Sequence, residues 1–207
     1  MKKYLTLILA ALTALALIGC GDKSGAADAS STNVTPTPVT LEDYSGERPA
    51  IEIVIKGYGT IKAELYPDIA PKSVENFLKL VDSHFYDGTT FHRIINGFMM
   101  QGGAPKEDSP ALTPIVGEFS NNGIPNTISH KRGILSMART PDVNSATSQF
   151  FIVQSDATYL DGSYAGFGKV LTGMDIVDKI CQEAPVVDDN GTVLAENQPI
   201  IETIRRA

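Results

Sequence analysis

A single arginine set among apolar residues is the first feature of this sequence that could carry chemistry. Arg93 lies in the segment Phe91–Gly103, which continues through Phe98 and Met99 to an amide side chain, Gln101. Burying an unpaired arginine is costly, so a guanidinium in this setting needs a partner or a cleft. Apolar walls with a few placed polar groups are typical of a ligand pocket, and this segment contains both kinds of residue.

A segment further along the chain has the residue types to complete such a pocket. Gln149 and Phe151 lie in Asn144–Ile152, where they add a second amide and a third large apolar side chain. Successive side chains of a strand face opposite sides, so Phe150 and Phe151 cannot share a face. We therefore expect one of these two rings to pack in the core and the other to line the site.

Other kinds of catalytic site find little support. The spacing of His84, His92 and His130 matches no zinc pattern. Ser148 lacks the strand–turn–helix context of a hydrolase nucleophile. The acidic turn Asp188–Gly191 lacks the later glutamate of a calcium loop, so we interpret it as a solvated turn. We expect no metal and no cofactor.

Periodic patterns predict the elements that must position these residues. Pro71 marks the start of a helix, and Val74, Phe77, Leu78 and Val81 form its apolar face. A second helix is expected to begin near Gly173. Period-2 alternation and apolar runs predict strands at Ile51–Ile55, Ile61–Leu65, Thr90–Ile95, Phe98–Gln101, Gly133–Ala138, Gln149–Gln154 and Ile200–Ile204. Short strands with two helices and no alternation of strand and helix predict an antiparallel barrel or a sandwich, and the pattern alone does not separate the two.

The first residues have the order of a bacterial export signal. A basic start, Met1–Lys3, precedes the apolar run Leu5–Ile18, which is too short for a membrane span. The sequence Leu17–Cys20 that ends the run resembles the lipobox of bacterial lipoproteins, where cleavage precedes a cysteine that receives lipid. A plain signal peptide and an uncleaved anchor are the alternatives.

This resemblance divides the chain into three parts. We expect a lipoprotein signal peptide at residues 1–19, a lipidated Cys20 with a flexible linker at residues 20–48, and one domain at residues 49–207. The linker is rich in Ser, Ala, Thr and Pro, which cannot bury enough apolar surface to order it. Acyl chains such as palmitate on Cys20 would anchor the protein, outside the cytoplasm, to a bacterial cell membrane. Cys181 would then have no disulfide partner.

The composition limits the classes of partner. The formal net charge is -7, and no basic stripe is visible along the 207 residues. Phosphate binding needs clustered lysines and arginines, so we expect no nucleic-acid partner. Hydrophobic residues make up 43% of the chain, which is enough for a sizeable core. We expect a monomer.

Four segments together resemble the cyclophilin family of peptidyl-prolyl cis-trans isomerases. They are Phe91–Gly103, Gly133–Arg139, Asn144–Ile152 and Leu160–Gly168, and the resemblance extends from about Ile51 to Ile204. The fold that it implies is mainly β: a closed eight-stranded antiparallel β-barrel capped by two α-helices. The activity that it implies is rotation about the peptide bond before proline, in proline-containing polypeptides.

The resemblance also implies roles for individual residues. Arg93 and Gln101 match the catalytic positions, with Arg93 directed at the proline nitrogen and Gln101 at the substrate backbone. The residues that match the substrate-binding positions are Phe98, Met99, Ala138, Gln149, Phe151, Tyr159, Leu160 and Tyr164. Isomerisation breaks no covalent bond, so it requires no nucleophile, metal or cofactor. Together with the export signal, this predicts a catalyst, with a chaperone-like role, for the folding of exported proteins.

Departures from the family pattern carry two further expectations. Tyr159 stands where the family has a tryptophan that contacts cyclosporin, and a phenol cannot replace the indole N–H, so we expect weakened cyclosporin binding with activity retained. Ala104 replaces a common aspartate, and Lys106–Pro110 replaces a glycine-rich loop. These changes leave open a second function: a module that binds proline-containing peptides with little or no catalysis.

Overall fold

The strands that alternate most cleanly in the sequence form the β1–β2 hairpin of the domain. The computed structural model describes residues 46–207, so the predicted signal peptide, Cys20 and most of the predicted linker lie outside the described residues. In β1 (Ala50–Ile55), three isoleucines at alternate positions are at most 1% exposed. Antiparallel pairing joins β1 to β2 (Gly59–Leu65) on one side and to β8 (Ile201–Arg206) on the other.

All eight strands belong to one antiparallel sheet. The remaining strands are β3 (Phe91–Ile95), β4 (Met99–Gly102), β5 (Ile134–Met137), β6 (Phe150–Val153) and β7 (Gly166–Thr172). Their order across the sheet is β3-β4-β6-β5-β7-β2-β1-β8. The prediction of a mainly β fold with eight antiparallel strands and two α-helices is therefore confirmed.

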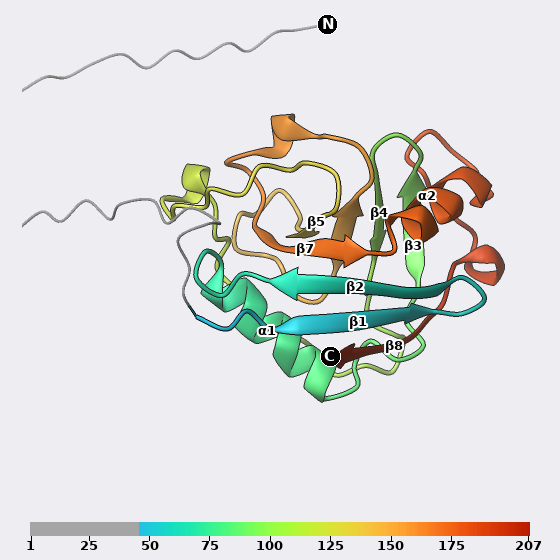
Figure 1. Cartoon of the computed structure of the whole chain (residues 1–207), viewed down its shortest axis with the longest axis horizontal. Helices are drawn as coiled ribbons and strands as arrows, with labels where there is room; N and C mark the ends of the chain where they lie inside the picture. Colours follow the sequence, from blue (N-terminus) through green and yellow to red (C-terminus); the bar gives the residue numbers. More distant parts are fainter. Residues whose placement is uncertain (1–45) are drawn as a thin grey trace, which may run out of the picture. The chain divides into compact units, whose positions relative to one another are not determined.

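The prediction of a closed barrel is wrong, because the sheet is a strongly curled half-barrel (Figure 1). Its two outer strands, β3 and β8, do not pair with each other as strands. The edge of β3 is instead occupied by the segment 190–193: the Ile94 amide donates to the Gly191 carbonyl, and the Val193 amide donates to the His92 carbonyl. The start of β8 meets only the start of β3, where the Phe91 amide donates to the Pro199 carbonyl and the Ile201 amide donates to the Thr89 carbonyl. The rest of this edge has its backbone partners in residues 190–193, so the barrel stays open.

Strand β7 was missed by sequence reasoning. Its glycines, Gly166 and Gly168, interrupt the apolar alternation that marks the other strands. They are needed for close approach: a Cβ on Gly168 would lie 2.7 Å from the Glu64 carbonyl oxygen, and one on Gly166 would lie 2.6 Å from the Ile128 side chain. Tight packing against neighbouring segments therefore requires glycine at these positions. Because of these glycines, the sequence lacks the apolar alternation by which a strand is recognised.

Two helices lie at opposite ends of the curled sheet, α1 (Pro71–Asp82) and α2 (Met174–Glu183) (Figure 1). As predicted, α1 begins at Pro71 and turns the predicted apolar face inward. Phe77 of α1 is fully buried, and its ring centroid lies 5.4 Å from that of Phe150 and 5.2 Å from that of Phe167. This aromatic cluster holds Phe150 of β6 in the core, so the next residue, Phe151, points to the opposite face of the sheet.

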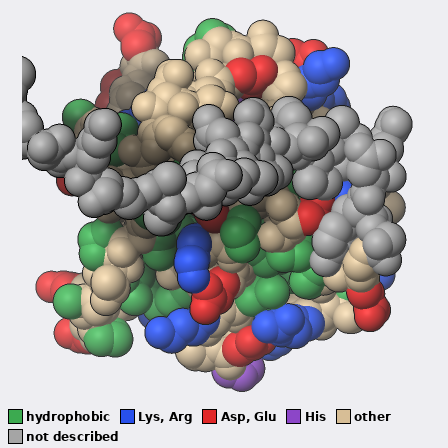
Figure 2. Space-filling view, turned by 90° about the vertical axis from the view of Figure 1, so that its left-hand side faces the viewer, with side chains coloured by type: hydrophobic (Ala, Val, Ile, Leu, Met, Phe, Trp, Pro, Cys, Tyr) green, Lys and Arg blue, Asp and Glu red, His purple; other side chains and the backbone are tan. Residues whose placement is uncertain are grey.

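The surface of the domain carries both signs of charge. On the face shown in Figure 2, basic and acidic side chains are interspersed and do not gather into a patch of one sign. Among residues 46–207, neither helix has the length and hydropathy that a membrane span requires.

Candidate active site

A tight hairpin places Arg93 and Gln101 side by side. Strands β3 and β4 are antiparallel with Arg93 opposite Gln101, so both side chains leave the same face of the sheet. The connecting turn contains Gly97 at a φ of 82°, and the Gly97 amide donates to the Gln154 side-chain oxygen at 2.6 Å. The turn is thus tied to the end of β6, which holds the hairpin in position.

The two amides and the guanidinium form a chain of hydrogen bonds. Arg93 Nη1 donates to Gln101 Oε1 at 3.3 Å, and Gln101 Nε2 donates to Gln149 Oε1 at 2.9 Å. Gln149 therefore acts on the site through Gln101, whose orientation it holds.

Asn190 holds the other side of the guanidinium, and sequence reasoning did not find it. Arg93 Nε donates to the Asn190 carbonyl oxygen at 2.8 Å and to its Oδ1 at 3.2 Å. The loop is held by Asp188, whose Oδ1 accepts from the Thr192 amide at 2.9 Å, and hydrogen bonds from Thr192 lower the pKa of that carboxyl. The acidic turn that we interpreted as merely solvated therefore positions Arg93.

A cavity opens beside this chain of hydrogen bonds. Its volume is about 310 Å³, close to the lower end of the range for small-ligand sites. Its walls are formed by Arg93, Phe98, Met99, Gln101, Ala138, Arg139, Phe151, Tyr159, Leu160 and Tyr164. Every predicted site residue in the described part of the chain is on this wall except Gln149, which contacts it through Gln101. Arg139 is the one lining residue that the sequence analysis did not select.

The walls of the cavity differ in their exposure. Phe151 and Met99 are almost completely buried, whereas Tyr159 is 71% exposed. Tyr159 lies on the short 3₁₀ turn Thr158–Leu160, and its ring centroid is 5.8 Å from that of Phe98. Phe150 faces the main core and Phe151 faces the cavity, as strand alternation predicts.

Behind the wall, His130 is fully buried between two polar partners. Its Nδ1 lies 2.9 Å from Asp161 Oδ1, and its Nε2 lies 2.9 Å from Ser136 Oγ. The ring stacks on Phe151 with centroids 6.1 Å apart. Burial lowers the pKa of His130, and the neighbouring Asp161 opposes this only in part. The neutral imidazole therefore donates from Nδ1 and accepts from Ser136.

These contacts argue against the hydrolase interpretation. Ser136, His130 and Asp161 contact one another in the order of a Ser–His–Asp relay. The Ser136 side chain is completely buried, however, and cannot reach a substrate. Ser148 is also buried, and its hydroxyl donates to the Gly103 carbonyl at 2.8 Å. Within residues 46–207, no group of three His, Cys, Asp or Glu side chains is placed to hold a metal.

Comparisons with known proteins agree with this geometry. The family described as "Cyclophilin type peptidyl-prolyl cis-trans isomerase/CLD" matches residues 50–205. A peptidyl-prolyl cis-trans isomerase of Acinetobacter baylyi is 50% identical over 130 residues, which cover 59% of this chain and 66% of the relative. Peptidyl-prolyl cis-trans isomerase B of Escherichia coli is 43% identical over 133 residues, covering 59% of this chain and 79% of that protein.

Solved structures show the same likeness. A cyclophilin-type isomerase of Cryptosporidium parvum superposes with a TM-score of 0.67 at 30% identity, covering 78% of this chain and 98% of the other. A second structure of that protein was determined in the presence of the dipeptide Ala-Pro, with a TM-score of 0.65 at 31% identity, covering 76% of this chain and 98% of the other. The family match and the named relatives support an isomerase. This chain belongs to the cyclophilin-type peptidyl-prolyl cis-trans isomerase family.

Proposed function

We propose that this chain accelerates X–Pro isomerisation in exported polypeptides by donating a hydrogen bond from Arg93 to the proline nitrogen. One observation carries the mechanism. Asn190 and Gln101 hold Nε and Nη1 of Arg93, while Nη2 has no hydrogen-bond partner among residues 46–207 and the side chain lines the cavity. A guanidinium fixed by two of its nitrogens presents the third in one orientation, which lowers the entropic cost of binding.

The chemistry of amide rotation explains why one donor suffices. The planar X–Pro bond resists rotation with a barrier of about 20 kcal/mol, because the nitrogen lone pair is delocalised into the carbonyl. In the twisted state that lone pair is localised on nitrogen and accepts a hydrogen bond. Arg93 therefore stabilises the twisted state more than either planar isomer, which is the condition for catalysis.

The remaining residues bind and desolvate the substrate. Phe98, Met99 and Phe151 surround a proline ring with apolar atoms and exclude water, so the field of the guanidinium is less screened. Gln101 uses one N–H on Gln149 and retains a second N–H for a backbone carbonyl of the peptide. The relative determined with Ala-Pro supports proline-containing peptides as the substrate class.

Exchange spectroscopy on a proline peptide tests the proposal. We expect Arg93→Ala to lower the catalysed cis–trans exchange rate by about 10²–10³-fold, the cost of removing one preorganised donor from a transition state. Arg206→Ala is the matched control, because Arg206 forms an exposed ion pair with Asp82 at 2.7 Å and does not line the cavity. Peptide binding without faster exchange in the wild-type protein would favour the binding module instead.

The export role rests on the sequence of the first twenty residues. We propose that Cys20 carries lipid and holds the monomeric domain at the outer side of a bacterial membrane, where unfolded exported chains emerge. Labelling with radioactive palmitate in the native host tests this. Label that survives in a Cys20→Ser variant, or a wild-type protein that takes up no label and leaves the membrane with salt, contradicts the anchor.

A further inference from the structure

Arg139 forms a second cationic group on the wall of the cavity. It follows β5, and its guanidinium carbon lies 4.6 Å from the ring centroid of Tyr164 and 5.2 Å from that of Phe119. The side chain is half-buried beside these two rings. Stacking fixes the plane of the guanidinium without neutralising its charge.

The hydrogen bonds of Arg139 also leave its charge uncompensated. Nε and Nη2 donate to the Ser163 carbonyl at 3.1 and 2.8 Å, and Nη1 donates to the Thr140 carbonyl at 2.9 Å. The two acceptors are both neutral carbonyls, and each terminal nitrogen retains one N–H for a ligand. Most other arginines of the domain differ: Arg132, for example, pairs with Asp178 at 2.6 Å.

No carboxylate offsets this charge inside the cavity. Arg93 and Arg139 are the charged residues that line it, and Asp and Glu are absent from the described residues of its wall. Asp161 lies next to Leu160 in the chain, but its oxygens accept from the Ser129 hydroxyl and the His130 amide, both at 2.7 Å. The binding site is thus locally positive in a chain whose formal net charge is -7.

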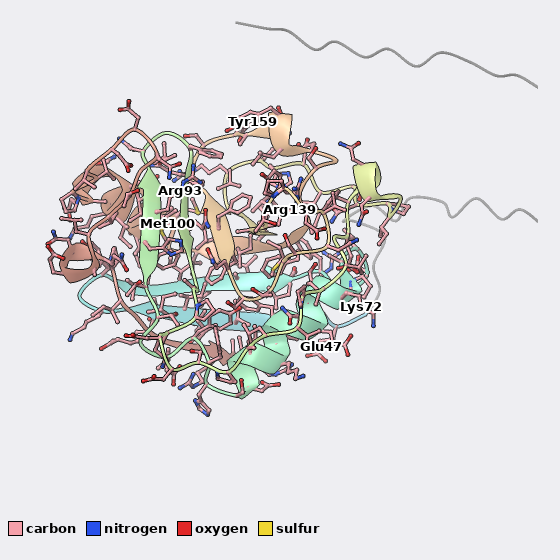
Figure 3. All side chains as sticks on the ribbon, turned by 180° about the vertical axis from the view of Figure 1, so that it is seen from behind. Glu47, Lys72, Arg93, Met100, Arg139 and Tyr159 are labelled. Carbon is pink, nitrogen blue, oxygen red and sulfur yellow. The ribbon has the colours of Figure 1, made fainter. Side chains whose placement is uncertain are left out.

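The two arginines are close enough to act on one peptide. Figure 3 shows both on the same side of the molecule, below the turn that carries Tyr159. They line one cavity of about 310 Å³, and consecutive residues of a peptide are about 3.8 Å apart. A residue one or two positions from a proline bound beside Arg93 therefore comes within reach of Arg139.

We propose that Arg139 determines substrate specificity by binding the carboxylate of an aspartate or glutamate that lies within two residues of the proline. The planar guanidinium, with one free N–H on each terminal nitrogen, matches the two oxygens of a carboxylate. The inference rests on the proposed isomerase function and adds the class of sequence that the enzyme prefers.

Matched peptides test this preference. Peptide pairs that differ only in Glu against Gln, placed before or after the proline, are compared by exchange spectroscopy for kcat/KM. We expect the wild-type protein to favour Glu by about two- to five-fold at one of these positions, the range of a partly exposed ion pair. Raising the salt concentration from about 0.05 to about 0.5 M shortens the screening length and should shrink the preference.

Variants assign the preference to Arg139. Arg139→Gln should remove it, Arg139→Lys should retain part of it, and Arg206→Gln should leave it unchanged. Equal rates for Glu and Gln peptides in the wild-type protein, or a preference that persists in Arg139→Gln, overturn the inference. A preference that ignores salt also overturns it, and that measurement needs no variant. Activity on the Gln peptides reports the isomerase itself, so failure of the proposed function is seen separately.

Discussion

Acidification should destabilise the domain through His130, the imidazole behind the cavity wall. The perturbation is protonation of Nε2, which now accepts from Ser136 at 2.9 Å and would have to become a donor. The side chain is completely buried, so the new charge has no access to water. Its ring stacks on Phe151, which lines the cavity, so the effect of pH reaches the site as well as the fold.

The sign of the effect follows from the direction of the pKa shift. Burial lowers the pKa of His130 below its value of about 6.5 in the unfolded chain, although Asp161 raises it in part. Between the two values the unfolded chain binds a proton that the folded protein does not. The stabilisation is therefore complete above about pH 6.5 and is lost as pH falls toward the folded pKa.

The dependence of the unfolding free energy on pH has an upper limit. One group contributes at most about 1.4 kcal/mol of unfolding free energy per pH unit. The pKa of His92 is also lowered, first by burial and then by Arg93, so it adds a slope of the same sign. The carboxyl groups act in a separate window: burial raises the pKa of Asp161, but hydrogen bonds from Ser129 and His130 lower it more, so its contribution is lost only at lower pH.

Urea unfolding between about pH 7.5 and 5 measures this slope. His130→Gln keeps a donor for Asp161 and an acceptor for Ser136 but cannot titrate. An amide does not reproduce the geometry of the imidazole, so we expect one of the two hydrogen bonds to be lost. The variant should therefore be less stable than wild type at pH 7.5 by about 1–3 kcal/mol, and the difference should shrink as pH falls. His92→Gln separates the second contribution. Parallel loss of stability in wild type and His130→Gln would refute the reasoning.

Three further predictions concern the site and the core. Asn190→Ala removes the Oδ1 acceptor of Arg93 but keeps the backbone carbonyl acceptor. In exchange assays, kcat should therefore fall by about two- to five-fold with KM nearly unchanged. An unchanged kcat would mean that the carbonyl alone positions Arg93. Phe77→Ala should lower the unfolding free energy by about 3–5 kcal/mol in urea, since the ring is fully buried; a loss below 1 kcal/mol contradicts this packing. Tyr159→Trp should tighten cyclosporin binding several-fold in calorimetry by adding an N–H donor, and equal affinity would show that this donor is not used.

Sequence patterns predicted the elements whose stability depends on local periodicity. The alternation of β1 and the apolar face of α1 are both present in the structure, with Phe77 buried as expected. Phe150 and Phe151 also separate as predicted, because a strand turns successive side chains to opposite faces. These features depend on residues a few positions apart, which a sequence displays directly.

Other parts of the fold depend on packing between distant segments. The glycines of β7 meet Glu64 and Ile128 across the structure, and this close approach hid the strand from pattern reading. Beyond Phe91, the outer edge of β3 takes its backbone partners from residues 190–193, about a hundred positions away, and so leaves the sheet open. A strand pattern specifies which face is apolar, but it does not specify which distant segment pairs with a free strand edge.

By itself, the sequence determined the kinds of side chain available to the site and, through resemblance to a family, predicted roles for Arg93, Gln101 and the apolar wall. Only the tertiary structure decided which atoms hold them. Asn190 contacts Arg93 from 97 positions away, and Arg139 became a lining residue because Tyr164 and Phe119 stack on it. Hydrogen bonds and stacking act over a few ångströms, so they form only after folding has brought distant residues together. The spacing of residues along a short segment does not show which distant residues will meet.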